Sequence, residues 1–225
     1  MKSFFFPPRN LRDELLDLDE ASYEEVQDSL QDVATVNRYL SGYRVLLQHM
    51  EPILRSHKAN RPFRVMDAAT GSADQPVELV KLARRIGIPI HITAIDINAK
   101  MLKLAQEEVA CYPEIQLLQC DILSLPFREN AFDLVVNSLS LHHFSWDKAV
   151  TILRTIYKAG RLGIVVNDLH RSRVAHVVIF ILTRIFTRNR LTRYDAPVSV
   201  MNAFTPKEFC DLAQQAKIDP YEIHR

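Results

Sequence analysis

Apolar residues from position 61 onward alternate between short continuous runs and segments of helical spacing. The continuous runs are rich in β-branched residues and predict five strands, within residues 63–68, 90–97, 115–122, 131–140 and 161–169. Helical spacing covers residues 76–87, 99–110 and 146–159, and residues 221–225 predict the start of another strand. Strands that alternate with helices predict a doubly wound, mainly parallel α/β sheet, which binds ligands at the carboxyl ends of its strands.

Polar and glycine residues mark where several of these helices begin and end. Gly87 is placed to end the first helix, and Asn98 is placed to cap the second. Thr205 and Glu208 form a capping box with Pro206 between them, which predicts a further helix near the end of the sequence.

Residues 1–60 precede the first strand and carry a helical pattern of their own. Ser22 and Glu25 form a capping box, and apolar residues recur at helical spacing through residue 50, with a break near Gly42. A helix before the first strand is placed to cover the edge of the sheet. We therefore expect a helical lid in residues 1–60, with residues 37–39 on its inward side or rim, and a main domain in residues 61–225.

Composition narrows the class of protein. The chain has 225 residues, of which 48% are hydrophobic and 24% charged, and its formal net charge is +1. These values are typical of a soluble globular protein, and the balanced charge argues against a nucleic-acid partner. The three cysteines show no C-x-x-C spacing, so no disulfide framework and no metal site is expected. No segment is typical of a signal peptide or a membrane span, which predicts a cytoplasmic protein.

The segment "MDAATGSAD", residues 66–74, follows the first predicted strand and contains a single glycine, Gly71. We expect Gly71 to adopt a positive φ or to allow a close backbone approach. Ala69 and Ala73 stand where a dinucleotide-binding turn has glycines, and their methyl groups disfavour a pyrophosphate. A ligand without phosphate is compatible with them. The cap of the following helix is expected from the same segment: Ser72 with Gln75, or Asp74 alone.

The pattern Asp67-x-Ala69-x-Gly71-x-Ala73 resembles motif I of class I S-adenosylmethionine-dependent methyltransferases. Later segments resemble the motifs that follow it in this family, in the same order: "AIDINAKML", "QCDILSLPF", "FDLVVNSLSLHHF" and "AGRLGIVVNDL". Each motif is weak by itself, but five in order are specific. The resemblance covers residues 61 to about 169 closely, and the flanking segments are similar to bacterial small-molecule methyltransferases of polyketide-type and quinone-type pathways.

The resemblance implies a Rossmann-like class I fold, with S-adenosyl-L-methionine as the cofactor and S-adenosyl-L-homocysteine as the product. It implies that Asp96, at the end of the second strand, accepts hydrogen bonds from the ribose hydroxyls. The implied cofactor-binding residues are Asp67, Ala69, Gly71, Ala73, Asp96, Ile97, Asp121, Ile122, Asn137 and Ser138. Asp121 has an alternative role as a turn acid before "SLPF".

Four side chains after the fourth and fifth strands are candidate catalytic residues. His142 and His143 are candidates for a base that takes a proton from an acceptor hydroxyl, and Asp168 with His170 forms a second candidate dyad. The alternative is that the histidines shape the loop and line the cofactor. Because the cofactor's positive sulfur already activates its methyl group, the reaction depends mainly on proximity and does not require a strong dedicated base.

The resemblance implies methyl transfer to a small, hydrophobic acceptor, and we expect a hydroxyl or phenol oxygen as the methylated atom. C-methylation of an aromatic or quinol is the nearest alternative. A non-catalytic protein that binds the cofactor or its demethylated product is a second class of hypothesis. A nicotinamide-dependent oxidoreductase is a third, which Ala69 and Ala73 disfavour.

Residues 171–203 read as an irregular, arginine-rich region after the fifth strand. Residues 171–193 contain no acid and six arginines: Arg171, Arg173, Arg184, Arg188, Arg190 and Arg193. One interpretation is a solvated basic face around an apolar helix at 174–186. A second is an acceptor-binding lid whose arginines meet a carboxylate or an acidic carrier, and a third is contact with a membrane surface. A second subunit, in a homodimer, is a further candidate to cover the apolar run.

Overall fold

The structure is a computed structural model that describes residues 7–18, 21–39 and 42–224, without the side chains of residues 36–42. The chain forms two compact units. The sheet unit consists of Val36–Ser138 and Arg154–Asn167. The helical unit consists of Met1–Thr35, Leu139–Leu153 and Asp168–Arg225. The expected position of residues 37–39 at a lid surface falls on side chains outside the described part of the chain.

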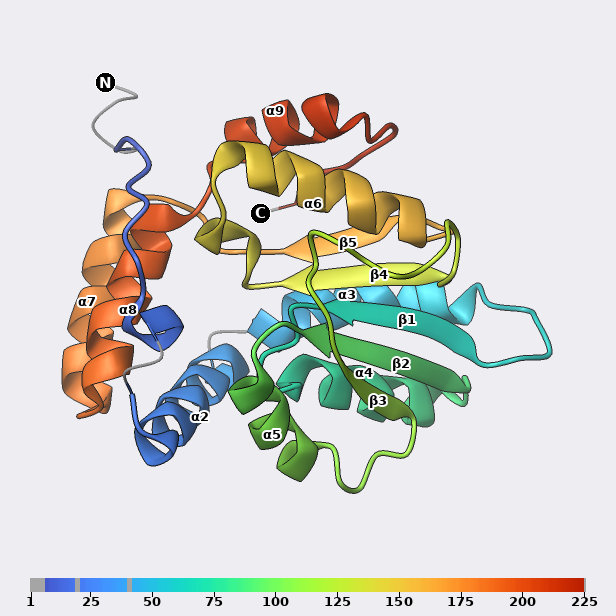
Figure 1. The fold of residues 1–225 in the computed structure, drawn as a ribbon, viewed down its shortest axis with the longest axis horizontal. Helices are drawn as coiled ribbons and strands as arrows, with labels where there is room; N and C mark the ends of the chain where they lie inside the picture. The colour runs from blue at the N-terminus through green and yellow to red at the C-terminus, as the bar shows by residue number, and fades with distance from the viewer. Residues whose placement is uncertain (1–6, 19–20, 40–41, 225) are drawn as a thin grey trace. The chain divides into compact units, whose positions relative to one another are not determined.

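The sheet unit contains five parallel strands, and Figure 1 shows them with helices packed around them. They are β1 (Phe63–Ala68), β2 (Ile90–Asp96), β3 (Ile115–Gln119), β4 (Leu134–Ser138) and β5 (Ile164–Asn167). Their order is β3-β2-β1-β4-β5, so the connections diverge on the two sides of β1. The predicted doubly wound sheet is confirmed, and the carboxyl ends of β1 and β4 meet at its topological switch point.

Three helices complete this unit: α3 (Gly42–Arg55), α4 (Asp74–Ile86) and α5 (Ala99–Glu108). The core joins α3 and α4 to the buried faces of the strands, because apolar residues recur along each helix at the spacing of one face. Leu46, Met50 and Leu54 of α3 are buried in this core. The division into a lid of residues 1–60 and a main domain stays a prediction, and the part of that lid formed by α3 packs with the sheet unit.

The observed ends of α4 and α5 can be compared with the caps that the sequence predicts. Gly87 ends α4 in a left-handed conformation, with φ of 72°, and Asn98 caps α5 by accepting from two backbone amides. The predicted cap of α4 is wrong. Its N-cap is Ala73, in a left-handed conformation with no side-chain hydrogen bond, because Ser72 Oγ instead donates to Asp74 Oδ1 at 3.3 Å.

The helical unit holds two 3-10 turns and most of the remaining helices. In the described residues these are η1 (Leu15–Leu18), η2 (Leu141–His143), α7 (Arg173–Phe186), α8 (Arg190–Asn202) and α9 (Pro206–Ala216), while α2 (Tyr23–Tyr39) and α6 (Trp146–Ala159) each include residues of both units. The capping boxes at Ser22–Glu25 and Thr205–Glu208 are confirmed. The break near Gly42 is also confirmed, since α2 ends at Tyr39 and α3 begins at Gly42.

Two predictions for the C-terminal third are wrong. Residues 171–203 are not irregular but form α7 and α8, which lie side by side in Figure 1. Ser172 and Asn189 accept hydrogen bonds from backbone amides of the first turns of these helices, so each helix has a local start signal. Residues 221–224 contain no strand. No helix in the described part of the chain is long and apolar enough to cross a membrane.

Candidate functional site

The turn after β1 adopts left-handed backbone at three alternating positions. The φ angles are 59° at Ala69, 57° at Gly71 and 62° at Ala73. A left-handed residue with a Cβ costs about 1–2 kcal/mol, so the two alanines keep a conformation that glycine would adopt more readily. A hydrogen bond from the Thr70 amide to the Ile95 carbonyl, at 2.9 Å, ties the turn to β2. The positive φ predicted for Gly71 is confirmed.

Asp96 lies at the end of β2 and holds this turn. Its Oδ2 accepts from the Gly71 amide at 2.9 Å, and its Oδ1 accepts from the Asn98 amide at 2.8 Å. Each carboxylate oxygen has two lone pairs, so both can accept a further hydrogen bond. Ile97, the next residue, is 63% exposed and offers an apolar surface beside the carboxylate. The role of Asp96 toward a ribose stays a prediction.

Two further acids flank the turn: Asp67, which is buried near the end of β1, and Asp74, which is partly buried at the start of α4. Burial, together with the negative charges of Asp74 and Asp96, raises the pKa of Asp67 to about 7, although the Thr70 side chain opposes the shift. Burial also raises the pKa of Asp74, although the Tyr43 hydroxyl donates to its Oδ2 at 2.5 Å and opposes the shift. Acids that are both desolvated and close to other acids favour a positively charged ligand. The turn therefore suits a cation without phosphate.

The end of β4 adds polar atoms next to the turn, because β4 pairs with β1 and Asn137 lies opposite Ala68. Asn137 Nδ2 donates to the Ala68 carbonyl at 2.8 Å and fixes the end of β1. Ser138 Oγ and, in the first turn of α4, Gln75 Oε1 are buried without a hydrogen-bond partner among the described residues. Buried polar atoms normally have partners, so these two fit a polar ligand at this edge.

The predicted adenine-contacting pair is placed by a local turn. Asp121 Oδ1 accepts from the Leu123 amide at 2.8 Å, which is the turn role considered for it. Ile122 is buried, with 6% of its surface exposed. A role of either residue toward a cofactor stays a prediction.

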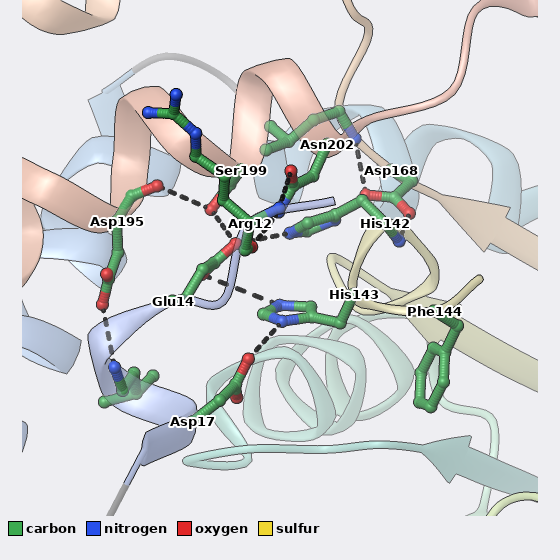
Figure 2. A network of polar contacts seen from close by, with 12 residues as sticks. Arg12, Glu14, Asp17, His142, His143, Phe144, Asp168, Asp195, Ser199 and Asn202 are labelled. Carbon is green, nitrogen blue, oxygen red and sulfur yellow. Dashed lines mark hydrogen bonds and ion pairs between the residues drawn. The ribbon is translucent and has the colours of Figure 1, made fainter. Parts of the chain in front are cut away.

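The helical unit assembles a second group of polar residues, drawn in Figure 2. His142 Nδ1 donates to Asp168 Oδ1 at 2.5 Å, and the His142 amide donates to Asp168 Oδ2 at 3.0 Å. His143 Nδ1 donates to Asp17 Oδ2 at 2.8 Å. The two imidazole rings are neighbours, with centroids 4.4 Å apart. The structure thus pairs Asp168 with His142, a pairing that the sequence does not suggest, while His170 is exposed.

Glu14 completes this histidine network, which we define as Glu14, Asp17, His142, His143 and Asp168. Glu14 Oε1 lies 3.7 Å from His142 Nε2, and its Oε2 lies 3.9 Å from His143 Nε2. Burial by itself would lower the pKa of His143. The hydrogen bond to Asp17 and the charges of Glu14, Asp17 and Asp168 outweigh burial and raise that pKa to about 9. Glu14 and Asp17 lie in the acidic N-terminal stretch, where sequence alone offers no signal for their partners.

Several arginines of residues 171–193 have partners within the helical unit. Arg171 is 3% exposed and donates to Glu208 Oε1 at 2.7 Å. Arg190 pairs with Glu25 at 2.7 Å, an exposed ion pair between α8 and α2. The helix predicted at 174–186 is confirmed as α7. One of its faces exposes apolar side chains at helical spacing: Val174, Val177, Val178, Ile181 and Ile185.

Comparison with known proteins places the sheet in a family. Residues 65–163 match the family model described as a methyltransferase domain. The chain is 25% identical over 149 residues to a demethylmenaquinone methyltransferase of Staphylococcus carnosus. The aligned residues cover 64% of this chain and 61% of that protein. The chain thus spans less than two thirds of the length of this curated relative.

Solved structures share the fold. One is described as an S-adenosyl-L-methionine-dependent methyltransferase from Methanococcus maripaludis, with a TM-score of 0.61, 16% identity, and coverage of 92% of this chain and 90% of that one. Another is the plantazolicin methyltransferase BpumL in complex with SAH, with a TM-score of 0.62, 13% identity, and coverage of 91% and 73%. Together with the match of residues 65–163 to the methyltransferase-domain model, the strand order and the turn after β1 indicate a methyltransferase domain with a Rossmann-like class I fold.

Proposed function

We propose that this protein transfers a methyl group from S-adenosylmethionine to a small, hydrophobic acceptor, with a hydroxyl or phenol oxygen as the first candidate for the methylated atom. The turn after β1 carries the proposal. Its buried acids favour a cation without phosphate, and it lies at the switch point of a methyltransferase-domain sheet. The hypotheses are a methyltransferase, a non-catalytic cofactor-binding protein and a nicotinamide-dependent oxidoreductase. A methyltransferase accounts for both the preference for such a cation and the position of the turn.

The residues of the sheet unit have distinct roles in this proposal. Asp96 and Ile97 hold the ribose and the adenine, Asp67 and Asp74 face the positive charge of the cofactor, and Ser138 supplies a hydroxyl. Ser138 Oγ and Gln75 Oε1 are the buried atoms that a bound cofactor would satisfy. When bound, S-adenosylmethionine supplies an activated methyl group. The protein then contributes mainly position and orientation.

A hydrophobic acceptor is supported by the exposed apolar face of α7. Seven large apolar residues of this helix are more than 40% exposed: Val174, Val177, Val178, Phe180, Ile181, Ile185 and Phe186. An ordinary surface helix exposes mainly polar side chains, so this face fits an apolar partner. We propose that α7 and α8 recognise the acceptor. Ile181→Ser is then expected to raise the acceptor KM several-fold and to leave cofactor affinity unchanged, with Lys207→Ser as the control.

C-methylation of a quinol is a second candidate, and the similarity to demethylmenaquinone methyltransferases favours it. The two candidates differ in the bond that forms. In O-methylation the acceptor oxygen gains the methyl group and loses its proton. In C-methylation a ring carbon gains the methyl group and loses a proton. The catalytic roles considered for His142, His143, Asp168 and His170 stay predictions under both candidates.

The proposal is tested in two steps with the full chain. Calorimetric titration with S-adenosylmethionine, S-adenosylhomocysteine and NAD is expected to detect binding of the first two alone. Transfer of a labelled methyl group to a panel of phenols, hydroxylated polyketide-type acids and demethylated quinols then identifies the acceptor, and NMR of the product distinguishes a methoxy from a C-methyl group. Binding of NAD in place of S-adenosylmethionine contradicts the proposal. Cofactor binding without turnover on any acceptor supports the non-catalytic alternative.

A further inference from the structure

We propose that Glu14, His142 and His143 form a binding site for one divalent transition-metal ion of the zinc class, within the helical unit. The site does not depend on the proposed methyl transfer, and its ligand Glu14 lies outside residues 65–163, which match the methyltransferase-domain model. Its three ligand atoms are one carboxylate oxygen and two imidazole nitrogens, all within 4.8 Å of one another.

The distances from the Glu14 oxygens to the two imidazole nitrogens are too long for hydrogen bonds. They are close to the distance between two ligand atoms that bind the same metal ion. Glu14 oxygens lie 3.7 and 3.9 Å from the two Nε2 atoms, beyond hydrogen-bonding distance. Zinc binds imidazole nitrogen and carboxylate oxygen at about 2.0–2.2 Å, which places two ligand atoms about 3.4 Å apart in a tetrahedral site. Because the three ligand atoms lie within 4.8 Å of one another, the side chains need to approach by at most about 1.4 Å (4.8 less about 3.4 Å) to share an ion.

Each histidine is oriented by a carboxylate on its other nitrogen. Nδ1 of His142 donates to Asp168, and Nδ1 of His143 donates to Asp17. These bonds occupy both Nδ1 atoms and leave the Nε2 atoms on the side of Glu14, as Figure 2 shows, where they can bind an ion once they have lost their protons. A histidine that ligates a metal almost always donates its second N–H to a carboxylate, a carbonyl or water.

Glu14 is oriented in the same way, from α8. The Ser199 hydroxyl lies 2.6 Å from Glu14 Oε1. Figure 2 shows Ser199 on the side of Glu14 away from His143. The carboxylate oxygens keep lone pairs for an ion. All three ligands thus have an outer partner that fixes their direction, which is the arrangement of built metal sites.

Burial and charge favour a cation at this point. The side chains of Glu14 and His142 are 6% and 3% exposed. Three carboxylates, of Glu14, Asp17 and Asp168, lie around the two imidazoles, so these five side chains carry a net negative charge even with both imidazoles protonated. A buried charge without compensation costs several kcal/mol, and a divalent ion among these ligands would supply the compensation.

The ligand set selects the class of ion. Two imidazoles and one carboxylate suit zinc, iron(II) and cobalt(II), whereas magnesium and calcium prefer oxygen ligands. Three protein ligands leave an open position, which water or a substrate oxygen can fill. A bound ion would also connect the N-terminal segment to η2, because His143 and Asp17 are 126 residues apart in the sequence.

Metal-stripped full-length protein is titrated with ZnCl2 by calorimetry and with CoCl2 by visible absorption. We expect one zinc ion per chain, the absorption bands of four- or five-coordinate cobalt, and a higher melting temperature with zinc. His143→Gln is expected to weaken zinc binding at least 100-fold. His176→Gln, a histidine of α7 bonded to the Pro197 carbonyl, serves as its matched control and should bind as the unmodified protein does.

Asp17→Asn tests the site without changing any of the three proposed metal ligands. Asp17 is half exposed, so the variant should fold, and loss of the outer carboxylate is expected to weaken zinc binding about 10–100-fold. The neighbouring, exposed Asp13 gives the control Asp13→Asn, which should leave zinc affinity unchanged. The proposal is overturned if folded protein binds zinc no more tightly than about 10 μM, or if Asp17→Asn and Asp13→Asn bind it equally.

Discussion

Asp67 in the turn region and Glu14 and Asp168 in the histidine network all have buried carboxylates, but the two groups of acids are compensated in different ways. In the turn, burial and two neighbouring carboxylates together raise the pKa of Asp67 to about 7. In the network, Asp17 and Asp168 each accept a hydrogen bond from an imidazole. The buried acid of the turn thus favours a positive ligand from outside, whereas Asp17 and Asp168 of the network already have hydrogen-bond donors within the chain.

The pH dependence of stability is expected to show this difference most strongly. Because burial keeps Asp67 protonated in the folded chain, its contribution to stability is full below the unfolded pKa of 3.8 and is lost as the pH rises through about 7. The loss is roughly 4 kcal/mol at most, since each pKa unit corresponds to about 1.4 kcal/mol. Urea unfolding of Asp67→Asn between pH 4 and 8 should lack this part of the decline.

A cationic ligand should reduce the same decline in the unmodified protein. Saturating S-adenosylmethionine favours the ionised form of Asp67, so it should stabilise the protein more at pH 8 than at pH 5. An equal stabilisation at both pH values would contradict the assignment of Asp67 to the cofactor's positive charge.

Removing an acid of the network should act on the folded protein directly. Asp168 is fully buried and pairs with His142 at 2.5 Å. Asp168→Ala removes this partner and leaves a buried imidazole unpaired, which we expect to cost about 3 kcal/mol of unfolding free energy. Asp13→Ala, an exposed acid of the same unit, should change stability by less than about 0.5 kcal/mol. Similar values for the two variants would show that the network contributes nothing to stability.

Asp96→Ala tests the cofactor edge of the sheet unit. We expect it to weaken S-adenosylmethionine binding by about 1.5–3 kcal/mol, because a hydrogen bond to a charged group is lost. Glu114→Ala removes an exposed acid that pairs with Arg84, and its cofactor affinity should be unchanged. Calorimetry measures both. An unaltered affinity in Asp96→Ala would exclude the ribose role.

The strained turn offers a gain in stability. Ala69 has a φ of 59°, so Ala69→Gly should raise the unfolding free energy by about 1 kcal/mol. Ala99 begins α5, a right-handed helix, and Ala99→Gly should lower stability by up to about 1 kcal/mol. Denaturant unfolding of the pair separates the backbone effect from the loss of a methyl group. A loss of stability in Ala69→Gly would mean that the methyl group packs favourably there.

Ser138→Ala is expected to have the smallest effect on stability, and it tests whether the Ser138 hydroxyl binds the cofactor. Its hydroxyl is buried without a partner among the described residues, so removing it should leave the stability of the free protein unchanged or slightly higher. Cofactor affinity should fall by about 1 kcal/mol if the hydroxyl binds the cofactor. Thermal melts and calorimetry distinguish the two effects, and an unchanged affinity would remove Ser138 from the site.

The sequence predicts those features correctly whose signals lie within a few residues of the element concerned. The strands from β1 to β5, the caps at Gly87 and Asn98, and the box at Thr205–Glu208 depend on spacing and local hydrogen bonds. The turn after β1 also brings its acids together locally, since Asp67 and Asp74 are seven residues apart. Its position relative to Asp96 follows from parallel pairing of adjacent strands.

The wrong predictions share a cause. Ser72 was a reasonable cap for α4 by residue type, but a left-handed Ala73 begins the helix and redirects the Ser72 hydroxyl. Residues 221–225 have the apolar alternation of a strand, yet residues 221–224 form none. Residues 171–203 are rich in arginine and are predicted to be irregular, but they form two helices with side-chain caps. At Ala73 the backbone conformation outweighed residue preference, whereas the caps at Ser172 and Asn189 are local signals that mark the starts of α7 and α8.

The sequence by itself determined the parallel sheet, the turn at its edge and the family to which that sheet belongs. Tertiary structure alone decided the histidine network. Asp17 reaches His143 across 126 residues, and Ser199 reaches Glu14 across 185. No periodicity or local motif links such positions, because their contact depends on how several helices and loops pack. His142 and His143 stand out in the sequence as reactive residue types, but the carboxylates that orient them are selected only by the fold.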